Sequence, residues 1–190
     1  MVSTRFDPSK ARAAILYISQ RLQSKSPEKR ADLYKTLKTL YFAERKHLAK
    51  YGRSITNDFY VAMEHGPVPS KTYDMIKLVR GDLFVRDNRE KERLSKMFAV
   101  ENKWDIIPRQ DADEDEFSES DIECLEEAIK KTAPLSFKEL KGISHDVAYK
   151  RASDKGEEVL AFEDMAAAEN PEPGMIETVK LNLENESFLH

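Results

Sequence analysis

Histidine and glutamate are the residues of this 190-residue chain that could bind a metal ion, and their spacing decides whether they do. Glu44 and His47 stand three positions apart, so on a helix they would share one face and could form half of a metal site. His65 or His145 could complete such a site in space. No two histidines have the close spacing of a zinc site, and His47 stands among charged residues, where we expect it to be solvated. The sequence therefore predicts no bound metal and leaves a metal-dependent enzyme as an alternative.

Nucleophilic catalysis finds no support either. Cys124 is the only cysteine, which excludes an intramolecular disulfide and a cysteine-rich zinc site. It stands beside Leu125 and Ile129 and among glutamates, so we expect a small, unreactive core residue. The glycine-flanked serine of hydrolases and the glycine-rich phosphate loops are both missing from the sequence. We predict that the protein is not an enzyme and uses no cofactor.

Charge is divided unevenly along the chain. Residues 1–110 carry a net charge of +10 and residues 111–190 carry −14, although the net charge of the whole chain is −4. The basic part alone could bind nucleic acid, through a cluster at 45–53 and a stretch at 86–96 in which acidic residues alternate with basic ones. We expect the acidic part to fold back against the basic part, and therefore predict no nucleic-acid partner. A DNA-binding transcriptional regulator stays the alternative function.

The composition is typical of one folded domain with a heavily charged surface. Hydrophobic residues make up 40% of the chain and charged residues 35%, and the six glycines are too few for a turn-rich all-β fold. The first residues lack the apolar segment of a signal peptide, and no apolar run approaches the roughly 20 residues that cross a bilayer. We expect a cytoplasmic protein without a membrane partner.

Helical patterns dominate the first fifty residues. Asp7 is placed to cap a first helix that Pro8 begins. A second helix is expected from about Glu28 to Tyr51, where Gly52 would end it. Its apolar stripe recurs with helical spacing and is interrupted by Glu44.

Further helices follow from capping signals later in the chain. A serine with an acidic residue three positions on predicts a capping box, and a lone serine can cap a helix by itself. We expect helices that begin near Ser70, Ser118, Ser136 and His145, and a helical stretch at 162–168.

Three segments have the character of strands. Residues 59–64 alternate between apolar and polar, and 97–100 and 104–108 predict a hairpin. Together they could form one small antiparallel sheet of about three strands, so the expected fold is mainly α (α+β). In the tail, the alternation at 179–183 allows a further short strand.

Restricted backbone is concentrated between His65 and Ser70, which we interpret as a rigid turn joining a strand to a helix. Gly66 can adopt a positive φ at little cost. Pro67 and Pro69 fix φ and lack a backbone donor. The needs of core packing alone do not readily explain so many restricted residues in one turn. A surface that must keep a fixed shape explains them better.

The sequence resembles the Panacea domain, the SocA-like antitoxin family that often occurs in phage-associated genes. The resemblance rests on LYFAE at 40–44, His47-Leu48, YGR at 51–53, YVAM at 60–63 and HGPVP at 65–69. The segments SFKEL at 136–140 and Ser144-His145 are similar to the family's closing region.

The resemblance implies an interaction protein with a mostly helical fold and a small sheet. It implies a cognate protein toxin, encoded nearby, as the partner that this protein binds and neutralises. A role as a proteolytic adaptor would add a protease or chaperone to the partners. The expected domains are residues 1–152, the Panacea domain, and 153–190, a C-terminal extension that is partly helical.

We expect the toxin to bind at the rigid turn, because a fixed backbone with exposed aromatic side chains offers contact area at low entropic cost. The candidate partner-binding residues are Tyr60, His65, Gly66, Pro67, Val68, Pro69 and Tyr73. If the tyrosines instead pack inside, the turn would only connect a strand to a helix.

Overall fold

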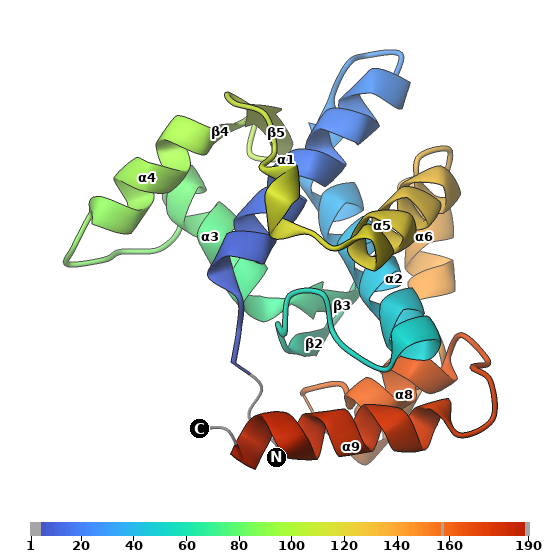
Figure 1. Cartoon of the computed structure of the whole chain (residues 1–190). Coiled ribbons are helices and arrows are strands. Elements are labelled where there is room, and N and C mark those ends of the chain that lie inside the picture. Colours follow the sequence, from blue (N-terminus) through green and yellow to red (C-terminus); the bar gives the residue numbers. More distant parts are fainter. Residues whose placement is uncertain (1–4, 157, 189–190) are drawn as a thin grey trace.

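The long helix α2 (Leu33–Tyr51) lies at the centre of the fold, with α1 (Pro8–Lys25) and α5 (Glu119–Thr132) packed against it (Figure 1). The structure is a computed structural model that describes residues 5–156 and 158–188; His190 lies outside them. Both α1 and α5 are amphipathic and bury their apolar faces against α2, because apolar residues recur on one side of each helix.

The remaining helices are shorter and surround this centre. They are α3 (Ser70–Arg80), α4 (Arg89–Met97), α6 (Phe137–Ser144), α7 (Val147–Lys155), α8 (Phe162–Ala167) and α9 (Met175–Phe188). A 3₁₀ turn, η1 (Glu114–Glu116), lies within the acidic segment before α5.

Most of the expected helix ends are confirmed. Asp7 caps α1, Ser118 and Ser136 form capping boxes, and Gly52 ends α2 with φ of +70°. The expected start of the second helix near Glu28 was wrong, because 31–32 form a strand and the helix begins only after it. Asp32 caps this helix: its carboxylate accepts a hydrogen bond from the Lys35 backbone N–H.

The strands form two separate sheets. One sheet has the order β1 (Ala31–Asp32), β5 (Asp105–Pro108), β4 (Phe98–Glu101), and the other is the hairpin of β2 (Tyr60–Met63) and β3 (Gly66–Pro69). The expectation that 59–64 would join the 97–108 hairpin was therefore wrong. Residues 59–64 pair with the strand that directly follows them, and β1 supplies the third strand of the other sheet.

The core has two parts, and α2 contributes to both. One part contains Leu40, Tyr41 and Phe42 of α2 with residues of α5 and α8. The other part contains Leu33 and Leu37 of α2 with apolar residues of α1, α3 and α4. Leu33 and Leu37 precede Leu40 on α2, so the two apolar clusters follow one another along this helix, and α2 joins the two parts of the core.

The segment after residue 152 shares the first part of the core. Phe162, Met165 and Val179 are buried in the same cluster as α2, and the position of the expected boundary, 152/153, falls within α7. The short strand expected at 179–183 was wrong, because this segment is in α9. Ile176, Val179 and Leu183 recur with helical spacing and face the core, while the other apolar residue of the alternation, Leu181, is exposed.

The acidic part of the chain does fold back against the basic part. Lys10 pairs with Asp121 at 2.6 Å, and Lys50 contacts Glu123 of α5 at 2.5 Å. Further ion pairs of this kind join Lys46 to Glu127 and Arg45 to Asp146 and Glu169. The basic cluster at the end of α2 is therefore neutralised within the molecule. In the described part of the chain, no helix has the length and apolarity needed to cross a membrane.

Candidate functional site

The β2–β3 hairpin turns at Glu64 and His65, one position earlier than expected, and the segment interpreted as a rigid turn is itself the strand β3. Met63 stands opposite Gly66, which has a φ of +95°. Two residues therefore suffice to reverse the chain, and the glycine supplies the left-handed backbone that follows the turn.

The alternating prolines make β3 an edge strand. Pro67 stands opposite Ala62, whose N–H points away from β3 and donates to Glu158 at 2.7 Å. The missing N–H of Pro67 therefore falls on the outer edge of β3, where no strand of the described residues pairs with it. On the other edge of the hairpin, Val61 forms an isolated bridge with Val159. The sheet is thus limited to the hairpin and this bridge.

Side chains of neighbouring helices hold the hairpin tip by its backbone carbonyls. The Lys38 ammonium, buried on α2, donates to the Pro67 carbonyl at 2.5 Å. Tyr34 of the same helix donates to the His65 carbonyl at 2.9 Å, and Tyr149 of α7 donates to the Met63 carbonyl at 3.1 Å. Burial lowers the pKa of Lys38 to about 7. These three hydrogen bonds fix the backbone of the tip.

Gly66 allows the tip to approach the helices closely. A Cβ atom at this position would lie 2.5 Å from the Ser144 hydroxyl oxygen and 3.0 Å from the Lys38 Nζ. Any side chain would therefore push the hairpin away from α2 and α6.

Exposed side chains surround this fixed backbone. The His65 ring contacts the Phe137 ring edge-on at 5.5 Å, and its Nδ1 lies 3.3 Å from the Lys141 Nζ. Met63 of β2 is also exposed. We call this surface the tip face and define it by Met63, His65 and Phe137.

The other candidate partner-binding residues lie elsewhere. Tyr60 is fully buried with its ring 5.5 Å from that of Tyr41, so it belongs to the core and not to the surface. Val68 is half-buried in the second part of the core, and Pro69 is buried before α3. Tyr73 lies in α3, beyond the open end of the hairpin, where it accepts a hydrogen bond from Arg80 at 3.3 Å.

The loop between α2 and β2 is held by Glu44, the residue that interrupts the apolar stripe of α2. Its buried carboxylate accepts from the Ile55 N–H at 2.8 Å and from the Ser54 hydroxyl. Burial raises the pKa of Glu44 to about 7, although these hydrogen bonds act in the opposite direction. The Glu44 side chain thus gives this loop one conformation.

Replacement of Glu44 by glutamine is expected to remove one component of the pH dependence of stability. In wild type the folded state keeps a proton on Glu44 between about pH 4.3 and 7 that the unfolded state has lost, so stability falls as pH rises. Over this pH range the free energy of unfolding of the wild type falls by an amount on the order of 3 kcal/mol. The Glu44→Gln variant should not show this fall. Urea unfolding from pH 4.5 to 7.5 measures the difference. Glu92→Gln, at an exposed position, should follow wild type; a Glu44 variant that does the same would contradict the assignment.

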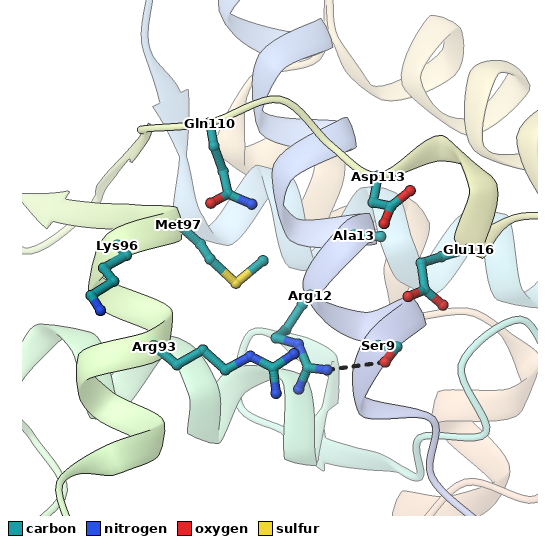
Figure 2. A pocket seen from close by; sticks show the side chains of 9 residues that line it. All are labelled: Ser9, Arg12, Ala13, Arg93, Lys96, Met97, Gln110, Asp113 and Glu116. Atoms are coloured by element: carbon teal, nitrogen blue, oxygen red, sulfur yellow. Dashed lines mark hydrogen bonds between the residues drawn. The ribbon is translucent and has the colours of Figure 1, made fainter.

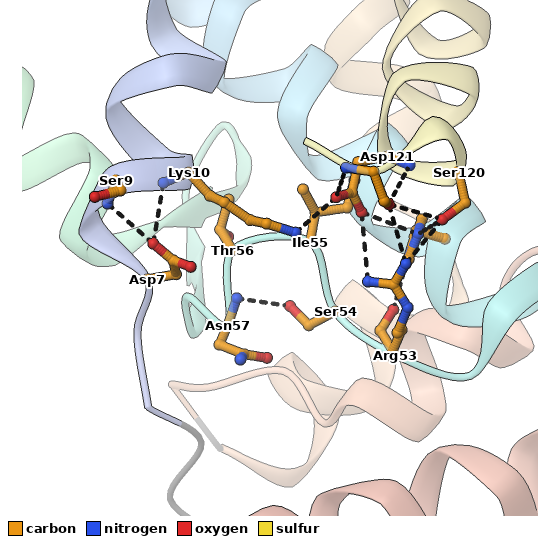
Figure 3. A network of polar contacts seen from close by, with 12 residues as sticks. Asp7, Ser9, Lys10, Arg53, Ser54, Ile55, Thr56, Asn57, Ser120 and Asp121 are labelled. Atoms are coloured by element: carbon orange, nitrogen blue, oxygen red, sulfur yellow. Dashed lines mark hydrogen bonds and ion pairs between the residues drawn. The ribbon is translucent and has the colours of Figure 1, made fainter. Parts of the chain in front are cut away.

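A second buried carboxylate, Asp121, collects three cationic or polar partners (Figure 3). Lys10 lies at 2.6 Å, His47 at 3.1 Å and Arg53 at 3.6 Å from its oxygens. The expectation that His47 is solvated was wrong: it is buried between this carboxylate and the Arg53 carbonyl, 2.7 Å away. Burial alone would raise the pKa of Asp121, but His47 and Lys10 hold it well below its usual range.

A third carboxylate, Asp58, caps α3 from outside the helix. Its oxygens accept from the Lys71 N–H at 2.9 Å and the Thr72 N–H at 2.8 Å. The expected cap, Ser70, makes no such bond and is the first residue of the helix. The hairpin is therefore anchored at its open end by Asp58 and at its tip by Lys38.

The groups that could do chemistry are engaged in these structural contacts. Within the described ranges, no three residues of the types His, Cys, Asp and Glu lie close enough together to hold a metal. Glu44 binds the loop and His47 binds Asp121, so the suggested half-site is divided between two networks. Cys124 is buried in the core, and burial raises the pKa of its thiol to about 11.

Sequence reasoning missed the residues that hold the tip. Tyr34 and Lys38 stand four positions apart on one face of α2, and a lysine at a core-facing position of this helix was the available signal. Phe137 and Tyr149 gave none, because only the folded chain brings α6 and α7 beside the hairpin.

The family model described as "Antitoxin SocA-like, Panacea domain" matches residues 37–149, more than half of the chain. The matched segment contains the hairpin, Lys38 of α2 and the helix α6, whereas Tyr34 precedes it. No curated protein and no solved structure matches the chain. The chain belongs to the SocA-like antitoxin family and carries its Panacea domain.

Proposed function

We propose that this protein binds and neutralises a protein toxin encoded beside it, and that the toxin contacts the tip face. Membership of an antitoxin family supports the partner class. The tip face supports the place, because it combines exposed apolar side chains with a fixed backbone.

The single observation that carries the proposal is that helices hold the tip backbone while its side chains stay exposed. Lys38, Tyr34 and Tyr149 bond three carbonyls of the hairpin, so little backbone entropy is lost when a partner docks. Phe137 is 51% exposed and flanked by His65, and an aromatic group with polar neighbours is typical of an interface centre.

Blocking the toxin and delivering it to a protease or chaperone would both begin with this contact. We propose a non-enzymatic action in the cytoplasm. It fits the structural roles of Glu44, His47 and Cys124, which are the residues considered above for metal binding or catalysis. The alternative of a DNA-binding regulator is not favoured, because Arg45, Lys46 and Lys50 at the end of α2 are ion-paired within the molecule.

Replacement of Phe137 by alanine is expected to weaken toxin binding about tenfold or more, because exposed aromatic anchors carry much of an interface's binding energy. The toxin is the purified product of the adjacent gene. Calorimetry measures the Kd, co-expression measures the rescue of growth, and thermal melting checks that the variant is folded.

The matched control is Phe84→Ala. Phe84 is 94% exposed in the α3–α4 loop, which lies at the opposite end of the molecule from α6 (Figure 1). Binding by this variant should equal that of wild type. If Phe137→Ala also binds as wild type does, the tip face is not the interface. If the neighbouring product neither binds nor harms growth, the toxin proposal itself fails.

A further inference from the structure

A cavity of about 290 Å³ lies between α1, α4 and the segment that leads to η1, away from the tip face (Figure 2). Basic side chains line one side of it, and Asp113 and Glu116 line the other. The Met97 side chain lies between the two sides and supplies an apolar wall. Neither the resemblance nor the family assigns a role to this cavity.

Arg12 is the unusual residue of the cavity. Its side chain is 8% exposed, yet its nearest carboxylate, Glu90, is 3.5 Å away, and its other contact is the neutral Ser9 hydroxyl at 3.0 Å. Arg45, which is buried to a similar degree, has two close carboxylates, one of them at 2.5 Å. A buried guanidinium without a close counter-ion is costly. Arg12 is therefore only weakly paired, by one carboxylate at long distance.

Two more cations face the same space. Arg93 and Lys96 stand three positions apart on α4 and line the cavity, and neither forms an ion pair with any described residue. Arg93 extends toward Arg12 across the cavity (Figure 2). Like charges that converge in this way repel each other unless an anion lies between them.

We propose that this cavity binds a small phosphorylated ligand, with its phosphate held by Arg12, Arg93 and Lys96. Guanidinium groups match phosphate oxygens in geometry and bond them in pairs. The volume is at the lower end of the range for small-molecule sites.

The carboxylates across the cavity narrow the ligand class. Asp113 and Glu116 accept hydrogen bonds from hydroxyl or amino groups and repel a second anionic group. A nucleoside monophosphate, with one phosphate at one end and a ribose at the other, has the required chemistry. A continuous polyanion such as nucleic acid would place further phosphates against these carboxylates.

Calorimetry with adenosine monophosphate at constant ionic strength tests the site. We expect saturable binding with one ligand per chain, at least tenfold weaker in Arg93→Gln, because one charge-assisted contact is lost. Arg93 is exposed, so its replacement leaves the fold intact. Arg89→Gln is the matched control: Arg89 stands on the same helix, is not part of the cavity lining and should bind as wild type does.

Three results would overturn the proposal. Adenosine without phosphate binding equally well would exclude phosphate recognition. Equal binding by wild type and Arg93→Gln, or no saturable binding at all, would exclude the site. If a short DNA duplex binds more tightly than the monophosphate, the phosphate that this site recognises belongs to a nucleic-acid backbone. That result would exclude the small ligand.

Discussion

Replacement of Gly66 by alanine is expected to lower the free energy of unfolding by about 3 kcal/mol. A φ of +95° costs an alanine about 1–2 kcal/mol. The added Cβ would lie 2.5 Å from the Ser144 hydroxyl and 3.0 Å from the Lys38 Nζ, so the hairpin must move and the hydrogen bond from Lys38 to Pro67 weakens. Urea denaturation of the two proteins measures the difference.

Two other glycines separate the causes. Gly81 also has a positive φ, +91°, but a Cβ there meets nothing within 4 Å, so Gly81→Ala should cost only the backbone term of about 1–2 kcal/mol. Gly142 lies in α6 with open space around it, and Gly142→Ala should stabilise the protein by up to about 1 kcal/mol. Equal losses at Gly66 and Gly81 would show that close packing of the tip plays no part.

Replacement of Asp121 by alanine is expected to cost about 3–5 kcal/mol, because it leaves the largely buried Lys10 without its counter-ion and the buried His47 without its carboxylate partner. It also removes the capping box of α5, in which this carboxylate accepts from the Ser118 N–H at 2.9 Å. The free energy of unfolding by urea at pH 7 gives the magnitude.

The pH dependence identifies the cause. Since the pKa of Asp121 is lower in the folded state, its contribution is complete above about pH 4 and is lost as pH falls below that value. The difference between wild type and variant should therefore shrink in acid. Glu123→Ala, on the same helix but in an exposed pair with Lys50, should cost far less than Asp121→Ala. Equal costs for the two variants would contradict a special role for Asp121.

Local signals predicted the helices well, because each cap depends on residues a few positions apart. Asp7, Ser118 and Ser136 cap the helices expected of them. The sheets were predicted less well, since pairing depends on which segments the helices bring together. Nothing in the two residues of β1 indicates that they pair with Ile106 and Asp105, about 75 positions later.

For the candidate site, the sequence predicted a fixed segment of backbone but not which aromatic side chains are exposed beside it. The glycine and prolines at 66–69 do mark a rigid segment, yet Tyr60 is buried and Phe137 takes the exposed aromatic position beside His65. The sequence of a strand does not show which of its two faces the helices will cover. The wrong expectation for His47 has the same cause, because the carboxylate that it contacts stands 74 positions away.

The contacts of α2 with the last helices have a consequence for fragments of this protein. Arg45 donates to the Ala168 carbonyl, Asn182 donates to the Gly52 carbonyl, and Phe162 and Met165 cover the apolar side of α2. A chain shortened at Tyr149, where the family match ends, would leave this apolar side open to water. Such a fragment would not be a smaller version of the domain. It would resemble an incompletely folded chain, whose exposed hydrophobic surface leads to aggregation and is recognised by chaperones and proteases.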